Sequence, residues 1–338
     1  MNLAIRLAEN GMVPDAITRF GIKRLLLSRL ANEQTRENGK DGIVRTMHTG
    51  ALAVHTENAN QQHYEVPTEF FKLMLGPRLK YSCGLFESSS ADLAQAEQDM
   101  LALTTKRAKI EDGMDILELG CGWGSLTLYL AEQFPTSRIT AVSNSTSQRD
   151  YIVSQAEQIG LNNLEVITSD MNDFDTDNRF DRVVSVEMFE HMRNYHLLLE
   201  RVADWLKTDG QLFFHVFCHR DTPYFFEVES SADWMSKHFF SGGVMPSYDL
   251  PTYFQDHLEL KQSWFVSGQH YARTCQHWLN NLAAHQSLAL AALGQSDNPE
   301  PDHIQFNRWR LFTMACEELF AYKGGTEWHV GHFLMAPK

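Results

Sequence analysis

A repeated alternation of short apolar segments and helical segments is the feature that most restricts how this chain of 338 residues can fold. Strand-like segments in residues 115 to 217 read "DILELG", "RITAVS", "LEVITSD", "FDRVVSVEMF" and "GQLFFHVF", and helical patterns such as "TSQRDYIVSQAEQIG" separate them. Strands that alternate with helices of this length are joined by right-handed crossovers, which makes them parallel in one doubly wound sheet. We therefore predict an α/β core whose ligands bind outside the carboxyl ends of the strands.

The rest of the chain has a different pattern on each side of this core. Beyond residue 220, "LELKQSWFVSG" (258–268) and "EWHVGHFLMA" (327–336) read as two closing strands around a long helical stretch. This predicts a mostly parallel, seven-stranded sheet with a helical insertion at about 270–325 that covers the site as a lid. We expect residues 1–108 to form an N-terminal helical lobe that closes over the site, and residues 109–338 to form the core.

A glycine-rich turn lies where the first strand meets the first helix, in "ILELGCGWGS" (116–125). Glycine permits positive φ and has no Cβ, so a ligand can lie against the backbone of such a turn. A dinucleotide site would show G-x-G-x-x-G and an acid about 20 residues later. Here the spacing is G-x-G-x-G, with Glu118 ahead of the turn. A purely structural tight turn is the alternative, but polar residues also follow three other strands, in "SNSTSQ", "SDMNDF" and "EMFEHM".

The net charge of −14 limits the partners of this chain. Binding to nucleic acid or to an anionic bilayer needs clustered Lys and Arg, so we expect neither and favour a cationic substrate. No apolar run approaches about 18 residues, and we expect no stable membrane insertion. The basic stretch "ITRFGIKRLLLSRL" (17–30) is expected to pack on the protein surface. Five cysteines, an odd number without metal spacing, indicate reduced thiols, a cytoplasmic location and no metal.

Several linked motifs resemble the S-adenosylmethionine-dependent methyltransferases of the cyclopropane-fatty-acid-synthase-like family, which includes the coclaurine N-methyltransferases. They are "QHYEVPTEFFKLMLG", "KYSCGLF", "LELGCGWGSLTLYLAEQ", "VEMFEHMRNY", "FFHVFCH", "FFSGGVMPS", "GQHYARTCQHW" and "EWHVGHFL". The resemblance runs from about residue 60 to the C-terminus. "VEMFEHMRNY" and "SGGVMPS" are more similar to the coclaurine-type enzymes than to the lipid enzymes. The resemblance implies a class I methyltransferase fold with S-adenosylmethionine as cofactor.

The resemblance also implies which residues hold the cofactor. Gly120 and Gly122 would lie beside its amino-acid part, and an amide pair after the second strand would hold its ribose. The full expected set is Tyr81, Ser82, Gly120, Gly122, Asn144, Gln148, Asp170, Met171 and Val186. Two alternatives stay open: Asp170 could cap the segment that follows it, and Tyr81 could be a core residue.

The stretch "EMFEHM" is the candidate for catalysis. Methyl transfer from a sulfonium to an amine is an in-line displacement, so an enzyme must position a neutral nitrogen and remove its proton. Glu187, Glu190 and His191 supply two carboxylates and an imidazole for this purpose. For Glu187 alone, positioning of the cofactor is an equal alternative. Phe225 and Trp234 are the expected substrate wall, since aromatic faces suit aromatic amines and cations.

These features predict an N-methyltransferase that acts on a secondary or tertiary, aromatic, alkaloid-like amine by direct in-line transfer. The alternative is a lipid C-methyltransferase or cyclopropane-fatty-acyl-phospholipid synthase, in which the resemblance implies a bicarbonate base. Cys83, Glu190 and His215 match residues that hold this bicarbonate, whereas Phe312 stands where a tyrosine is expected. Cys316 is expected to be a buried residue in helix packing and not a nucleophile. A homodimer is compatible with the pattern but not required by it.

Overall fold

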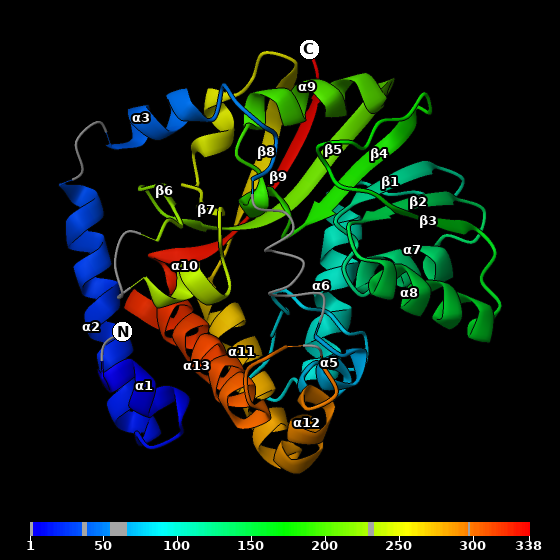
Figure 1. The fold of residues 1–338 in the computed structure, drawn as a ribbon. Helices are drawn as coiled ribbons and strands as arrows, with labels where there is room; N and C mark the ends of the chain where they lie inside the picture. The colour runs from blue at the N-terminus through cyan, green and yellow to red at the C-terminus, as the bar shows by residue number, and fades with distance from the viewer. Residues whose placement is uncertain (1–2, 36–38, 55–65, 229–232, 297) are drawn as a thin grey trace.

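The computed structural model describes residues 3–35, 39–54, 66–228, 233–296 and 298–338. Its centre is a seven-stranded sheet with the strand order β3-β2-β1-β4-β5-β9-β8 (Figure 1). The strands are β1 (Asp115–Leu119), β2 (Arg138–Ser143), β3 (Leu164–Thr168), β4 (Phe180–Val186), β5 (Leu206–His219), β8 (Leu258–Val266) and β9 (Trp328–Pro337). β1 to β5 pair in parallel, and β9 runs antiparallel to both β5 and β8. This confirms the predicted mostly parallel, doubly wound fold.

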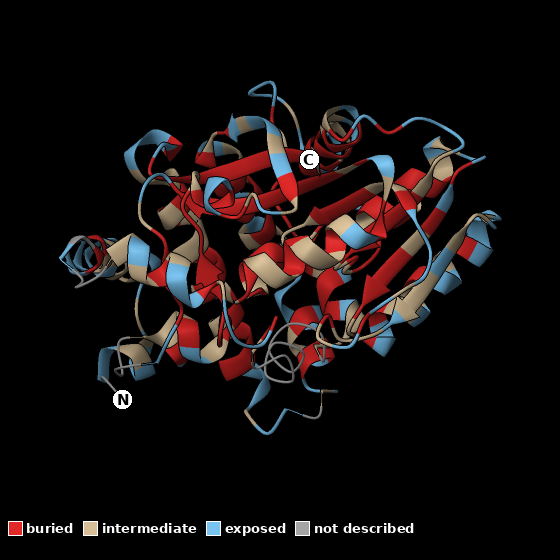
Figure 2. Ribbon diagram, turned by 90° about the horizontal axis from the view of Figure 1, so that it is seen from above, coloured by how far each residue is buried: buried red, intermediate tan, exposed pale blue. Residues whose placement is uncertain are grey.

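Helices on both faces bury the sheet. Figure 2 shows the strands at its centre as buried. Most of the buried side chains of β1, β4 and β5 are apolar, and the polar ones are Glu118, Ser185, His215 and His219. The crossover helices are α7 (Ser125–Gln133), α8 (Thr146–Ile159) and α9 (Tyr195–Trp205). Two of them begin where a side chain can accept a hydrogen bond from a free backbone N–H: Ser145 caps α8 and Asn194 caps α9. These caps fix where the loops after β2 and β4 end, and so place the polar residues of both loops.

The N-terminal part consists of helices that pack on the C-terminal part of the chain. They are α1 (Leu3–Glu9), α2 (Asp15–Gln34), α3 (Gly39–Thr46), α5 (Thr68–Met74) and α6 (Leu93–Arg107). The basic helix α2 lies against α13 (Asp302–Ala321) (Figure 1). Arg19 reaches Glu317 at 2.7 Å and Glu318 at 2.8 Å. A basic side chain of α2 therefore pairs with acids of α13, as expected for a helix that packs on the protein surface.

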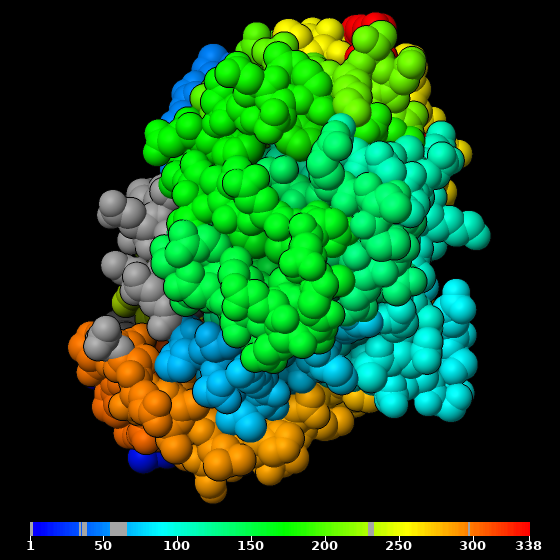
Figure 3. All heavy atoms as spheres, turned by 90° about the vertical axis from the view of Figure 1, so that its right-hand side faces the viewer, coloured from blue at the N-terminus to red at the C-terminus, as the bar shows by residue number. Residues whose placement is uncertain are grey.

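The predicted helical insertion lies between β8 and β9. It comprises α11 (Gly268–Ala284), α12 (Gln286–Leu293) and α13. α12 contacts α5, and Figure 3 shows these two regions, orange and light blue, side by side at one end of the molecule. None of the helices in the described part of the chain combines the length and the apolar character needed to cross a bilayer.

Candidate active site

Two adjoining cavities open at the carboxyl ends of β1, β2 and β4. The larger has a volume of about 1380 Å³ and the smaller about 70 Å³. A cavity for one small ligand usually has about 300–1,000 Å³, so the larger one has room for two molecules side by side. Both cavities are bordered by Gly120, Gly122, Gln148, Glu187 and His191. These residues therefore lie where the two cavities adjoin.

The glycine turn forms part of this boundary. Gly120 and Gly122 both have positive φ, +77° and +52°. A Cβ added to Gly120 would lie 2.7 Å from the Met188 side chain, whereas one added to Gly122 would project into open space. Two buried polar atoms near the turn, Trp123 Nε1 and Ser125 Oγ, also have no hydrogen-bond partner among the described residues. Open space beside bare backbone, with unused donors around it, fits the binding of S-adenosylmethionine here.

The smaller cavity gathers the residues expected at the ribose and adenine. Asn144, Gln148, Asp170 and Met171 all border it. Gln148 Oε1 accepts a hydrogen bond from the Ser143 hydroxyl at 2.7 Å, which fixes the amide in one orientation. Asp170 Oδ1 accepts from the backbone N–H of Asn172 at 2.8 Å. Asp170 therefore caps the following turn, as the alternative proposed, and borders the cavity as well.

The N-terminal part supplies one side of the larger cavity. Tyr81 and Ser82 border it, as does Val186 from the end of β4. Lys80 also borders it, and sequence reasoning missed this residue. Its ammonium group is buried and donates to the carbonyl oxygen of Cys83 at 2.9 Å and to the Ser82 hydroxyl. Burial lowers the pKa of Lys80, although the nearby Glu187 carboxylate opposes this shift.

Glu187 is held more firmly than any other acid in the site. Its backbone has φ of +51°, a conformation that is strained for a residue with a Cβ. Its carboxylate accepts hydrogen bonds from the Tyr271 hydroxyl at 2.6 Å, from His215 Nε2 at 3.1 Å and from the backbone N–H of Cys83 at 3.1 Å. Burial raises the pKa of Glu187 to about 7, against the opposing effect of Lys80 and of these donors. Near neutral pH this group can thus exchange a proton.

A line of buried hydrogen bonds extends behind Glu187. Arg107 Nη1 lies 2.9 Å from His332 Nδ1, and His332 Nε2 lies 3.0 Å from His215 Nδ1. Arginine can only donate, so His332 Nδ1 accepts, His332 Nε2 donates to His215, and His215 Nε2 donates to Glu187. Both imidazoles are neutral in this arrangement, and burial lowers the pKa of each well below its usual value. The sequence indicated His215 only as a possible bicarbonate ligand and gave no sign of its partner.

Glu190 and His191 lie on the one-turn helix η1 (Phe189–His191) after β4. Glu190 is 1% exposed and borders the larger cavity. Its Oε2 has no hydrogen-bond partner within the described parts of the chain. Burial, and then the negative charge of Glu187, raise the pKa of Glu190 well above its usual value. The His191 ring stacks on Phe240 with centroids 5.7 Å apart. Glu187 and His191 therefore border both cavities, whereas Glu190 borders only the larger one.

The two expected substrate-wall residues have different environments. Trp234 borders the larger cavity, and its indole N–H donates to Glu9 of α1 at 3.0 Å. Phe225 does not border the cavity: it packs in the core, with the Arg193 guanidinium 3.9 Å from its ring centroid. Its neighbours Tyr224 and Phe226 border the cavity instead, because successive strand residues point to opposite faces. The aromatic side chains that border it are Phe20, Tyr81, Trp123, Phe217, Tyr224, Phe226, Trp234, Phe240, Tyr271, Trp278, Phe312 and Phe320.

Most of the residues that matched the lipid enzymes do not border the two cavities. In the described chain, neither Cys83 nor His215 is among the residues that border either cavity. The Cys83 thiol instead donates to the Gly84 carbonyl at 3.2 Å. Cys316 lies half-buried on α13, where it packs against the hydrophobic core and also borders the larger cavity. Burial raises the pKa of its thiol, which keeps it protonated and a poor nucleophile.

Comparison with known proteins gives a consistent result. The mycolic acid cyclopropane synthetase family matches residues 53–328. The chain is 35% identical to an (S)-coclaurine N-methyltransferase of Papaver somniferum, covering 99% of this chain and 97% of that protein. It is 37% identical to an (S)-coclaurine N-methyltransferase of Thalictrum flavum subsp. glaucum, covering 98% and 94%.

A solved structure of similar length supports the same assignment. The crystal structure of a coclaurine N-methyltransferase bound to N-methylheliamine and SAH superposes with a TM-score of 0.92 at 34% identity and covers 98% of both chains. This confirms the expected fold and cofactor. The chain belongs to the mycolic acid cyclopropane synthetase family, and it is an S-adenosylmethionine-dependent N-methyltransferase.

Proposed function

We propose that the acceptor is a secondary or tertiary, aromatic, alkaloid-like amine, and that Glu190 and His191 orient it and remove its proton. The observation that carries this proposal is Oε2 of Glu190, which is buried on the wall of the larger cavity next to His191 and has no hydrogen-bond partner among the described residues. A buried carboxyl without a partner is costly unless a ligand completes it. An ammonium group would do so, since it donates a hydrogen bond and its positive charge favours the ionised form of the carboxyl.

When bound, S-adenosylmethionine supplies an electrophilic methyl group for direct displacement. The proposed cofactor residues are Tyr81, Ser82, Gly120, Gly122, Asn144, Gln148, Asp170, Met171 and Val186. The chain's own part in the reaction is to turn an ammonium into a nucleophile. Loss of the N–H proton to His191 or Glu190 exposes the nitrogen lone pair, and Glu187 supports this step with negative charge. The wall, with Phe226 and Trp234 as proposed substrate contacts, excludes water and stabilises the cationic product by its aromatic faces.

The lipid alternative has less support. The full-length relatives are N-methyltransferases, and neither Cys83 nor His215 is among the described residues that border either cavity. Phe312, where a tyrosine hydroxyl would be needed, stacks on Phe239 with centroids 4.2 Å apart.

The proposal also concerns the setting of the enzyme. We place it in the cytoplasm because all five cysteines are free thiols, which suits a reducing compartment. We propose that residues 1–108 act as a lobe that closes over the cofactor and that residues 109–338 form the core. A homodimer is proposed on the exposed apolar side chains of α1 and α2, such as Leu3, Ile17 and Phe20. Light scattering on the purified protein would test the dimer.

The deciding experiment offers two acceptors to the enzyme with methyl-labelled S-adenosylmethionine: tetrahydroisoquinoline-type amines and vesicles of unsaturated phospholipid. Label in the amines alone is the expected result. Label in the lipid alone would overturn the proposal and assign Glu190 to a bicarbonate site.

A further inference from the structure

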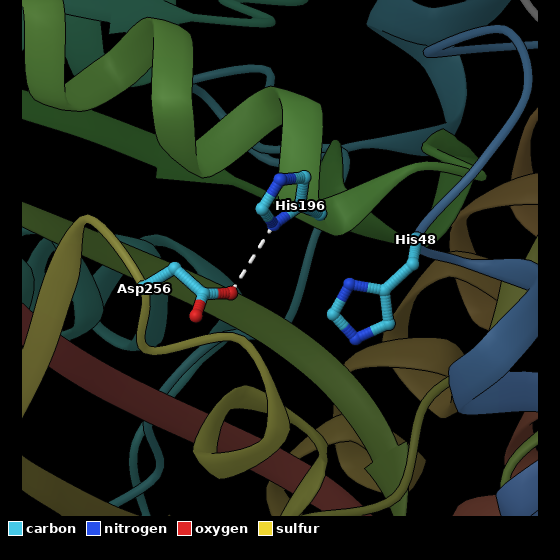
Figure 4. A group of neighbouring side chains, drawn as sticks. All are labelled: His48, His196 and Asp256. Atoms are coloured by element: carbon cyan, nitrogen blue, oxygen red, sulfur yellow. Dashed lines mark hydrogen bonds and ion pairs between the residues drawn. The ribbon is translucent and has the colours of Figure 1, made fainter.

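We propose that this protein has a binding site for a divalent transition metal ion of the zinc type, formed by His48, His196 and Asp256. The site lies outside both cavities. Its side chains come from three segments far apart in sequence: the turn after α3, the first turn of α9 and the loop before β8. Figure 4 shows them facing a common space. This site could not be predicted from the sequence, because no two of the three residues have a metal-ligand spacing.

The spacing of the three groups fits one ion. One ligand atom from each residue lies within 4.8 Å of the others. His196 Nδ1 and Asp256 Oδ2 are 3.2 Å apart. Ligand atoms around tetrahedral zinc are about 3.4 Å apart, given metal-ligand bonds of about 2.0–2.1 Å. One pair is therefore already close to that spacing, and His48 offers the third ligand atom within 4.8 Å of the other two.

The backbone that carries His48 is fixed on α9. The Met47 carbonyl accepts from the backbone N–H of His196 at 3.5 Å, and the Leu52 carbonyl accepts from that of Arg193 at 2.7 Å. The Asn194 side chain donates to the Gly50 carbonyl at 3.0 Å. Phe254 also packs against the His48 ring, with centroids 4.7 Å apart. A site on a fixed backbone loses little entropy when the ion binds.

The donor set selects the class of ion. Two imidazoles and one carboxylate suit zinc, copper or nickel, whereas magnesium and calcium prefer oxygen ligands. A second set, His196, Glu200 and His257, shares His196 with the first. Its Glu200 and His257 are 4.0 Å apart, wider than the closest pair of the first set. We therefore assign the ion to His48, His196 and Asp256.

The ion would have a structural role. The segment that follows His48 leads to Ala53, which forms a β-bridge with Met192, and to Val54, and both residues border the smaller cavity. An ion that joins His48 to α9 and to the loop before β8 would thus hold in place the segment that forms one wall of the smaller cavity, where the cofactor is proposed to bind. It would not take part in methyl transfer, because it lies outside both cavities.

The test is equilibrium binding of zinc to the full-length, chelator-treated protein, measured by competition with a chromophoric chelator and by thermal unfolding. We expect one equivalent of zinc per chain and a rise in the unfolding midpoint on zinc addition. His48→Ala and Asp256→Ala should each weaken binding by about tenfold or more and abolish the rise. His285→Ala, at an exposed histidine outside the cluster, is the matched control and should bind zinc like the parent protein.

Three results would overturn the proposal. The first is no binding at micromolar zinc in the parent protein. The second is equal affinity in His48→Ala and His285→Ala. The third is loss of binding in Glu200→Ala and His257→Ala with binding retained in His48→Ala, which would assign the ion to the second set. Because the unfolding midpoint without zinc is measured for every variant, loss of the site is distinguished from loss of the fold.

Discussion

His215 and His332 face each other across β5 and β9 with their ring nitrogens 3.0 Å apart, and both side chains are fully buried. Two neutral histidines in contact can bond only if one donates and the other accepts. Arg107, which donates to the far side of His332, decides the direction. His332 therefore holds His215 in the tautomer whose Nε2–H donates to Glu187, the acid with the strained backbone.

His332→Leu should impair catalysis although His332 touches neither cavity. Without a donor at its Nδ1, His215 is no longer held in the tautomer that donates to Glu187, so the carboxylate loses stabilisation and its pKa rises. We expect kcat/KM to fall about tenfold at neutral pH, with the acidic limb of the pH profile moved to higher pH. His332→Gln, which retains a donor, should restore part of the activity.

A control on the same strand separates this effect from simple loss of packing. His329 is also buried on β9 but stands outside the line from Arg107 to Glu187. His329→Leu should leave the acidic limb in place. If His332→Leu also left it in place, His332 would have only a packing role.

Stability should depend on pH through Glu187. Burial raises the pKa of Glu187 from 4.5 to about 7, so the folded state binds this proton more tightly than the unfolded state. The stabilisation is complete below about pH 4.5 and is lost as pH rises through 7. Relative to Glu187→Gln, which cannot titrate, the free energy of unfolding of the parent protein should fall by about 2 kcal/mol between pH 5 and 8. Parallel urea titrations of both proteins measure this difference, and a constant difference would contradict it.

The fold and the catalytic cluster could be predicted because both depend on local patterns. Apolar strands between helices specify the sheet, and "EMFEHM" directly follows a strand that ends at the cavity. Lys80 could not be found this way, since a single lysine in a loop reads as exposed until distant segments bury it. The contact of His215 with His332 depends on the register of two strands more than 100 residues apart. Phe225 was misplaced because its strand, β6 (Tyr224–Phe225), is two residues long and shows no alternation that would reveal its inner face.

Gly122→Ala should weaken binding of S-adenosylmethionine more than it weakens the fold. A Cβ there meets no protein atom within 4 Å, so it would occupy space proposed for the cofactor. Gly160→Ala is the matched control: Gly160 also has positive φ, +73°, and open space around it, but lies at the end of α8. Both variants should lose about 1–2 kcal/mol of stability from the backbone. Calorimetry with S-adenosylmethionine should show a loss of affinity of about tenfold or more in Gly122→Ala alone. Equal affinities would argue against this cofactor position.

Methyl transfer should not depend on bicarbonate. Both ring nitrogens of His215 are hydrogen-bonded, one to Glu187 and the other to His332. The Cys83 thiol donates a hydrogen bond to a backbone carbonyl. No donor of these two residues is thus left for an anion. Initial rates in buffer purged of carbon dioxide should equal those after bicarbonate is added back. Recovery of activity on addition would support the lipid-type mechanism.

Replacement of His191 should lower the turnover number and leave the affinity for S-adenosylmethionine unchanged. It borders both cavities and stacks on Phe240, so removal of the side chain could lower activity either by loss of a base or by collapse of the wall. His191→Phe keeps a flat ring at this position without a nitrogen, whereas His191→Ala removes both. If His191 is the base, both variants should lose about 10²–10⁴-fold in kcat, while affinity for S-adenosylmethionine stays close to that of the parent protein. If His191→Phe retained full activity with an unchanged pH profile, the ring would serve only as part of the wall, and Glu190 would be left as the group that takes the proton.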